Sequence, residues 1–152
     1  MRRVLVIDDE PDVRLLYRVN LRHAGYEVLE ADDGERGIEI ALEHLPDAVV
    51  LDLMMPRADG FEVLKVLRSH PEAGDVPVLV LTADTRRDDH RRCYELGADD
   101  VITKPFVPED LTRGVGRILD ASLEDRIARR SESAGASGDS RSADPVKRPA
   151  VR

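Results

Sequence analysis

The chain has 152 residues and a formal net charge of −8, with 31 acidic and 23 basic side chains. That length suits one domain with some residues to spare, and so acidic a chain repels nucleic acid, which disfavours direct DNA binding. The single cysteine excludes an intrachain disulfide, and no apolar run approaches the ~18 residues of a membrane span, so we expect a cytoplasmic protein.

The first third of the chain predicts alternating strands and helices. Residues 3–7 form an apolar run typical of a strand buried on both faces. Apolar side chains at helical spacing follow over 11–23, and Gly25 is a suitable stop for that helix. A short, half-polar strand is expected at 27–30, near a sheet edge. A second helix is expected from 33 to about 44, where Pro46 breaks the pattern.

The rest of the chain continues the alternation. A third strand is expected at 47–51, then a loop at 52–59, a helix at 60–69, a fourth strand from 77 to 81, a charged helix at 86–96 and a fifth strand at 101–103. Pro108 suits the first turn of a last helix, which we expect to end near Leu123 or Arg130. From Ser131 onward small and polar residues replace the aliphatic ones, which is typical of a disordered tail. We therefore expect a domain over 1–123, and a helix end and disordered tail over 124–152.

Five such units with short connections predict an α/β fold, in which helices cover both faces of a parallel sheet. Polar side chains stand where four of the strands end: Asp8 and Asp9, Asp52, Thr82 and Lys104. Because the carboxyl ends of parallel strands share one edge of a sheet, these side chains are expected to share one crevice. Three carboxylates, a hydroxyl and an ammonium suit a divalent cation and a phosphoryl group.

Over about residues 2–122 the chain resembles the receiver domain of two-component response regulators, of the stand-alone type. The resemblance rests on motifs that occur in the family's order and spacing. They are Asp8-Asp9-Glu10-Pro11, Asp52 to Pro56 with Asp59-Gly60, Leu81-Thr82-Ala83, Gly97 to Asp100, and Lys104-Pro105-Phe106. The resemblance implies a flavodoxin-like, doubly wound, five-stranded sheet with strand order 2-1-3-4-5.

The resemblance also implies the chemistry. Asp52 corresponds to the acceptor of a phosphoryl group from a sensor histidine kinase or histidine phosphotransfer protein, and the domain signals to a downstream effector protein rather than acting as an enzyme. Mg²⁺, with Mn²⁺ as a substitute, would be held by Asp9, Asp52 and the backbone carbonyl of Met54, and by Asp8 mainly through water.

The remaining site residues follow from the same resemblance. Thr82 and Lys104 would contact the phosphoryl oxygens, together with the backbone N–H groups of Met54 and Ala83. The bond between Lys104 and Pro105 would be a cis peptide, which X-Pro bonds tolerate.

Two positions depart from the family pattern. Val101 stands where relatives carry a Tyr or Phe that moves together with the switch threonine, here Thr82, and valine is stiff at χ1, so we expect a weaker or differently built switch. Met54 is apolar and cannot orient a water, so we expect a long-lived phosphoryl group.

A weak homodimer through the fourth helix, fifth strand and fifth helix is a further hypothesis. It rests on the mixed charges of 86–95, Asp99, Asp100 and Arg113, and exposed ion pairs contribute little each.

Three other functions fit parts of the pattern. A pseudo-receiver would act only as a docking module, which the intact acidic set disfavours. A Mg²⁺-dependent phosphohydrolase that forms an aspartyl phosphate would need a second Asp where this chain has Met54. A flavin or nucleotide binder would need a phosphate-binding loop where this chain has Asp8-Asp9-Glu10-Pro11, which repels phosphate without a metal.

Overall fold

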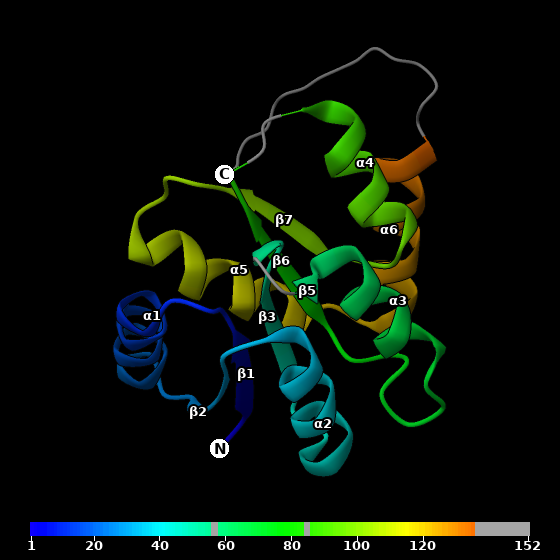
Figure 1. Ribbon diagram of the computed structural model, residues 1–152. Helices are drawn as coiled ribbons and strands as arrows, with labels where there is room; N and C mark the ends of the chain where they lie inside the picture. The colour runs from blue at the N-terminus through cyan, green and yellow to red at the C-terminus, as the bar shows by residue number, and fades with distance from the viewer. Residues whose placement is uncertain (56–57, 84–85, 136–152) are drawn as a thin grey trace.

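The structure is built around a five-stranded parallel sheet, seen at the centre of Figure 1. The computed structural model describes residues 1–55, 58–83 and 86–135. The strands follow the spatial order β2 (Glu27–Ala31), β1 (Arg3–Ile7), β3 (Ala48–Asp52), β6 (Val78–Thr82) and β7 (Asp100–Thr103). Since β6 and β7 are the fourth and fifth strands of this sheet, the predicted order 2-1-3-4-5 is confirmed.

Helices cover both faces of the sheet. On one side lie α1 (Pro11–His23) and α5 (Pro108–Asp120), and on the other lie α2 (Gly34–His44), α3 (Gly60–Ser69) and α4 (Arg87–Glu95) (Figure 1). The predicted doubly wound α/β fold is therefore confirmed. None of the helices within the described residues is long and apolar enough to cross a membrane.

The central strands explain why the sheet forms. Every residue of β3 and β6 is buried. Successive side chains of a strand point to opposite faces, so β1 contributes Leu5 and Ile7 to the core beneath α2 and α3, and Val4 and Val6 to the core beneath α1 and α5. A continuous aliphatic run supplies both cores at once, as the sequence predicted.

The segment after β3 contains a small hairpin that the sequence did not predict. Met54 and Met55 form β4 (Met54–Met55), which pairs antiparallel with β5 (Ala58–Asp59). The Asp59 side chain then accepts a hydrogen bond from the N–H of Phe61 and caps α3. Residues 54–55 and 58–59 of the expected loop are therefore paired as short strands, and residues 56–57 lie outside the described part of the chain.

The C-terminal part of the chain corrects the prediction of one last helix. Helix α5 ends at Asp120, Ala121 adopts an extended conformation, and a separate helix α6 (Leu123–Gly135) follows and packs against α4 (Figure 1). Helix α6 continues past Ser131, where disorder was expected. The rest of the expected tail, 136–152, lies outside the described residues.

Charge rather than apolar packing holds α6 in place. Its buried residue is Arg126, and its Leu123 and Ile127 are 38% and 48% exposed. Arg126 and Arg130, one helical turn apart, both bind the carboxylate of Asp99, at 3.0 and 2.9 Å. This explains the missed helix, because a search for apolar periodicity does not detect a helix that docks through arginines.

The same contacts correct the role expected of Asp99. The sequence placed Asp99 on a surface for dimerisation, but its side chain is fully buried and also binds Arg68 of α3 at 3.0 Å. Asp99 therefore holds this chain's own helices together. Two other expected dimer residues pair within the chain as well, Asp100 with Arg117 and Arg113 with Asp110.

Candidate functional site

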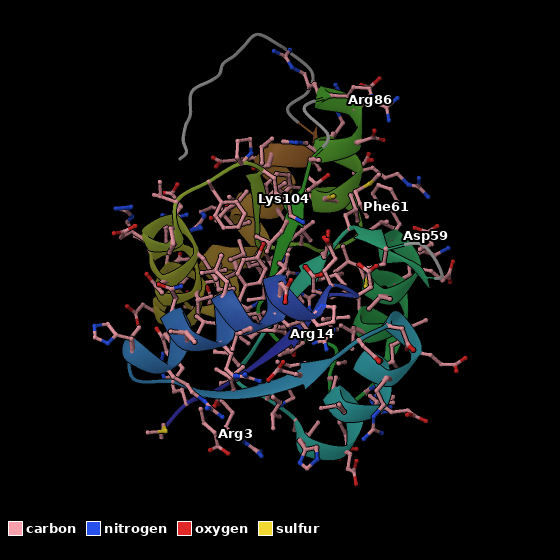
Figure 2. The ribbon with its side chains drawn as sticks, turned by 60° about the vertical axis from the view of Figure 1, so that its left-hand side comes forward. Arg3, Arg14, Asp59, Phe61, Arg86 and Lys104 are labelled. Atoms are coloured by element: carbon pink, nitrogen blue, oxygen red, sulfur yellow. The ribbon has the colours of Figure 1, made fainter. Side chains whose placement is uncertain are left out.

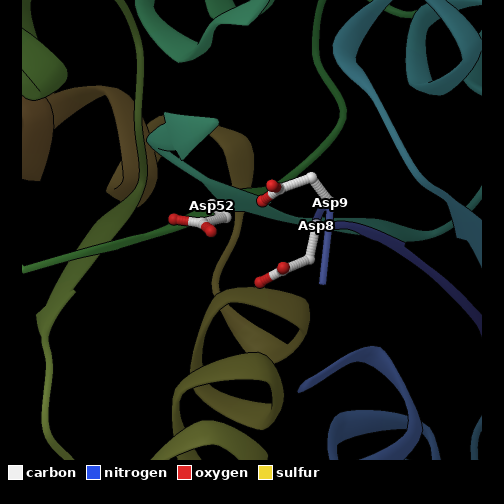
Figure 3. Close-up of side chains that lie close together, drawn as sticks. All are labelled: Asp8, Asp9 and Asp52. Carbon is white, nitrogen blue, oxygen red and sulfur yellow. The ribbon is translucent and has the colours of Figure 1, made fainter. Parts of the chain in front are cut away.

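The sheet brings the predicted site residues together at one edge. Asp8 and Asp9 follow β1, Asp52 ends β3, Thr82 ends β6 and Lys104 follows β7. One carboxylate oxygen from each of Asp8, Asp9 and Asp52 lies within 4.8 Å of the other two, and Figure 3 shows the three side chains converging. The three predicted carboxylates therefore lie close together at this edge of the sheet.

Asp52 lies at the centre of this group. Its side chain is almost fully buried. Its Oδ1 accepts a hydrogen bond from the backbone N–H of Met54 at 3.1 Å, and its Oδ2 lies 3.4 Å from the ammonium nitrogen of Lys104. Each carboxylate oxygen thus has one positive or hydrogen-bonding partner, which holds the group in a fixed orientation.

Asp8 is buried, and only one of its two carboxylate oxygens accepts a hydrogen bond. Its Oδ1 accepts a hydrogen bond from the backbone N–H of Glu10 at 2.9 Å, whereas its buried Oδ2 has no hydrogen-bond partner among the described residues. Burial raises the pKa of Asp8 to about 6, and the negative charge of Asp52 adds to this. The Glu10 N–H and the Lys104 ammonium lower the pKa and offset part of the effect.

These residues fit a divalent cation. Three carboxylates meet with Lys104 as their nearest ammonium, so the group carries excess negative charge. The unpartnered Oδ2 of Asp8 is a buried acceptor in need of a positive partner. Carboxylate oxygens are the ligands that Mg²⁺ prefers, and a few of them suffice because Mg²⁺ keeps several waters.

A backbone hydrogen bond joins the ends of β6 and β7 beside the acidic group. Thr82 is fully buried, and its carbonyl oxygen accepts a hydrogen bond from the N–H of Lys104 at 2.7 Å. Ala83, the next residue, is exposed. The peptide bond between Lys104 and Pro105 is cis, as the resemblance implied.

Val101 is part of the fold rather than of the crevice. It pairs with Val80 in the register of β6 and β7 and packs, partly buried, against the core on the α2 and α3 face. Met54, by contrast, has a side chain that is 61% exposed directly beside Asp52.

Two residues close to the site, Arg14 and Glu30, were not predicted from the sequence. Arg14 of α1 donates a hydrogen bond from Nη1 to the backbone carbonyl of Asp8 at 2.8 Å, and its Nε lies 3.4 Å from Oε1 of Glu30. A lone arginine one turn into a helix carries no motif, so only its spacing from the acidic strand end could have pointed to it.

A groove lies next to the crevice, between α1 and the segment that joins β7 to α5. Its volume is about 260 Å³, and its lining includes Leu16, Tyr17, Lys104 and Phe106. The rings of Tyr17 and Phe106 stack with their centroids 6.0 Å apart, and Leu16 is 51% exposed. Lys104 therefore connects the acidic crevice with an apolar surface.

Comparison with known proteins agrees with this geometry. The family model of the response regulator receiver domain matches residues 4–115. A crystal structure of the chemotaxis response regulator CheY4 of Vibrio cholerae aligns with a TM-score of 0.74 and 33% identity, covering 78% of this chain and 98% of that one.

Curated relatives are longer than this chain. The DNA-binding dual master transcriptional regulator RpaA of Synechocystis sp. is 43% identical over 78% of this chain and 49% of its own length. The response regulator MprA of Mycolicibacterium vanbaalenii is 41% identical over 99% of this chain and 63% of its own length. The chain thus spans about half to two thirds of these relatives, and it belongs to the response regulator receiver domain family.

Proposed function

We propose that this chain is a phosphoacceptor switch in which Asp52 receives a phosphoryl group in a Mg²⁺-dependent reaction. The observation that carries the proposal is the setting of Asp52, whose carboxylate lies between the Lys104 ammonium and the other two acidic side chains. The donor would be the phosphohistidine of a sensor histidine kinase or histidine phosphotransfer protein. The chain would then signal to a downstream effector protein in the cytoplasm.

The transfer forms one bond and breaks another. A carboxylate oxygen of Asp52 attacks phosphorus, an oxygen–phosphorus bond forms, and the phosphorus–nitrogen bond of the phosphohistidine breaks as the imidazole leaves. Lys104 and the N–H of Met54 already point at the Asp52 carboxylate, so they are placed to offset the charge on the transferring oxygens.

The other site residues have supporting roles in this proposal. Asp8, Asp9, Asp52 and the carbonyl of Met54 would hold Mg²⁺ or Mn²⁺, which neutralises charge that the carboxylates and the phosphoryl group would otherwise concentrate. The Thr82 hydroxyl and the Ala83 N–H would contact the phosphoryl group. Thr82 would also be the switch residue, with Val101 in the place of the usual aromatic partner.

One surface fits a partner that the proposal requires. The groove beside Lys104 is lined by apolar side chains and opens next to the acceptor, which suits the phosphodonor. The downstream effector would be a separate partner protein. RpaA is named as a DNA-binding regulator, but the acidic charge of this chain disfavours direct contact with nucleic acid.

The test is phosphorylation by acetyl phosphate in the presence of Mg²⁺. Mass spectrometry should show a gain of one phosphoryl group in the wild-type protein and in Asp32→Ala, and none in Asp52→Ala. Asp32 is a matched control because it also follows a strand at this edge, yet it is exposed and outside the acidic group. An unmodified wild-type protein would contradict the proposal and leave a docking module.

The lifetime of the phosphoryl group should depend on Met54. Because this exposed, apolar side chain cannot orient a water, Met54→Asn is expected to shorten the half-life of the phosphorylated protein about tenfold. That is less than the ~100-fold or more that a positioned general acid or base contributes. Met54→Leu is the control and should leave the half-life unchanged. The decay of the phosphorylated mass after removal of acetyl phosphate measures both, and equal half-lives in the two variants would refute the prediction.

A further inference from the structure

We infer that Arg14 is a positioning residue for the cation site, one that sets the direction of the Asp9 side chain by holding the peptide group between Asp8 and Asp9. This inference rests on the proposed function, since it concerns the same acidic crevice. It assigns a role to Arg14 of α1, which lies outside the acidic group, and to Glu30 of β2, whose carboxylate binds Arg14.

The contacts of Arg14 are with the backbone rather than with the acidic side chains. Its Nη1 donates to the Asp8 carbonyl oxygen at 2.8 Å, and its side chain is only 18% exposed. Figure 2 shows Arg14 between α1 and β2, on the side of the sheet where α1 packs. Its guanidinium therefore connects α1 to the acidic turn, the Asp8-Asp9 segment that precedes this helix.

The planarity of the peptide group carries this contact to Asp9. The carbonyl of Asp8 and the N–H of Asp9 belong to one rigid plane, so fixing the carbonyl oxygen fixes the point from which the Asp9 side chain departs. The preceding peptide is held as well, because the N–H of Asp8 donates to the carbonyl of Ala31 in β2 at 3.1 Å. Asp9 is therefore placed by two neighbouring backbone contacts.

Glu30 keeps the guanidinium of Arg14 in position. Its Oε1 lies 3.4 Å from Nε of Arg14, and its Oε2 binds Nη1 of Arg18, one turn further along α1. Glu30 stands next to Ala31 in β2, so the strand end that accepts the Asp8 N–H also binds the side chain of Arg14. The set Glu30, Arg14 and the Asp8 carbonyl links β2, α1 and β1 at the edge where the cation would bind.

The role of Arg14 is positional more than electrostatic. The side-chain charges that move the pKa of Asp8 most are those of Asp52 and Lys104. A guanidinium directed at a carbonyl oxygen leaves the carboxylates to the cation, whereas one directed at a carboxylate would compete with it. Loss of Arg14 should therefore weaken cation binding through poorer geometry.

Isothermal titration of the metal-free protein with Mg²⁺ tests the inference. Arg14→Gln should raise the dissociation constant about tenfold, as is usual when a group that orients a metal ligand is lost. Arg18→Gln is the matched control, since it removes the other arginine on Glu30 without touching Asp8, and its Mg²⁺ affinity should stay within about twofold of wild type, a change of only a few tenths of a kcal/mol. Arg14→Lys should lie in between, because one ammonium cannot replace the fork of donors.

The outcomes separate this inference from the proposed function. A wild-type protein that binds no Mg²⁺ would refute the function itself. Wild-type binding with an unchanged affinity in Arg14→Gln, or an equal loss in Arg18→Gln, would overturn the role of Arg14 alone. Should Arg14→Gln fail to fold by circular dichroism, Glu30→Gln decides: it should weaken Mg²⁺ binding in the same direction, and an unchanged affinity would overturn the inference.

Discussion

Replacement of Asp99 by alanine is expected to lower the free energy of unfolding by about 3–5 kcal/mol, the usual cost of removing one partner from a buried ion pair. The Asp99 carboxylate is fully buried and binds Arg68, Arg126 and Arg130, and it also accepts the N–H of Val78 at 2.8 Å. Without it, three largely buried guanidinium groups would lose the carboxylate that all of them bind.

Asp99 also stabilises the charged form of Arg68. Burial lowers the pKa of Arg68 to about 10, and Asp99 is the main influence that keeps it from falling further. Helix α6 depends on the same carboxylate, since Arg126 is its buried residue. We therefore expect α6 to lose its protection against hydrogen exchange in Asp99→Ala before the sheet does.

Urea unfolding of Asp99→Ala beside Asp100→Ala measures the effect. Asp100 is the matched control because its ion pair with Arg117 is partly exposed, and such pairs contribute at most about 1 kcal/mol. Equal destabilisation of the two variants would show that the Asp99 cluster does not carry the stability assigned to it.

Asp8→Asn is expected to stabilise the metal-free protein at pH 7 by about 3 kcal/mol, because a pKa raised by about two units makes ionisation unfavourable in the folded state. The pKa of Asp8 rises from 3.8 to about 6. When the pH is below the pKa of the unfolded state, a carboxyl group with a raised folded-state pKa is neutral in both states and does not affect stability. As the pH rises from about 4 to about 6, it destabilises the fold progressively. The asparagine keeps the Oδ1 that accepts from Glu10.

Thermal unfolding in the presence of a chelator checks this prediction. The gain in Asp8→Asn should be present at pH 7 and should disappear at pH 4, where wild-type Asp8 is already neutral. Added Mg²⁺ should raise the melting temperature of the wild type and raise that of the variant less, since the stabilisation that a ligand gives grows with the logarithm of its affinity. The exposed Asp32→Asn serves as control, and a variant less stable than wild type at pH 7 would refute the assignment.

The sheet and the grouping of acidic side chains at its edge could be predicted from the amino-acid sequence. The central strands can be recognised in the sequence because they are aliphatic throughout. A strand that is buried on both faces has no alternating polar residues. Asp8, Asp52, Thr82 and Lys104 could be placed at one edge because parallel strands end on the same side of a sheet. Both predictions depend only on local patterns and on the geometry of the sheet.

The polar contacts that hold these parts in place could not be predicted from local sequence patterns. Helix α6, the arginines on Asp99 and the bond from Arg14 to the Asp8 carbonyl are polar contacts between residues brought together by the fold. An arginine that will bind a buried carboxylate 27 residues away has the same local pattern as one that faces solvent. The spacing of apolar residues predicts which face of a helix or strand is buried, but it does not predict which charged side chains will contact one another.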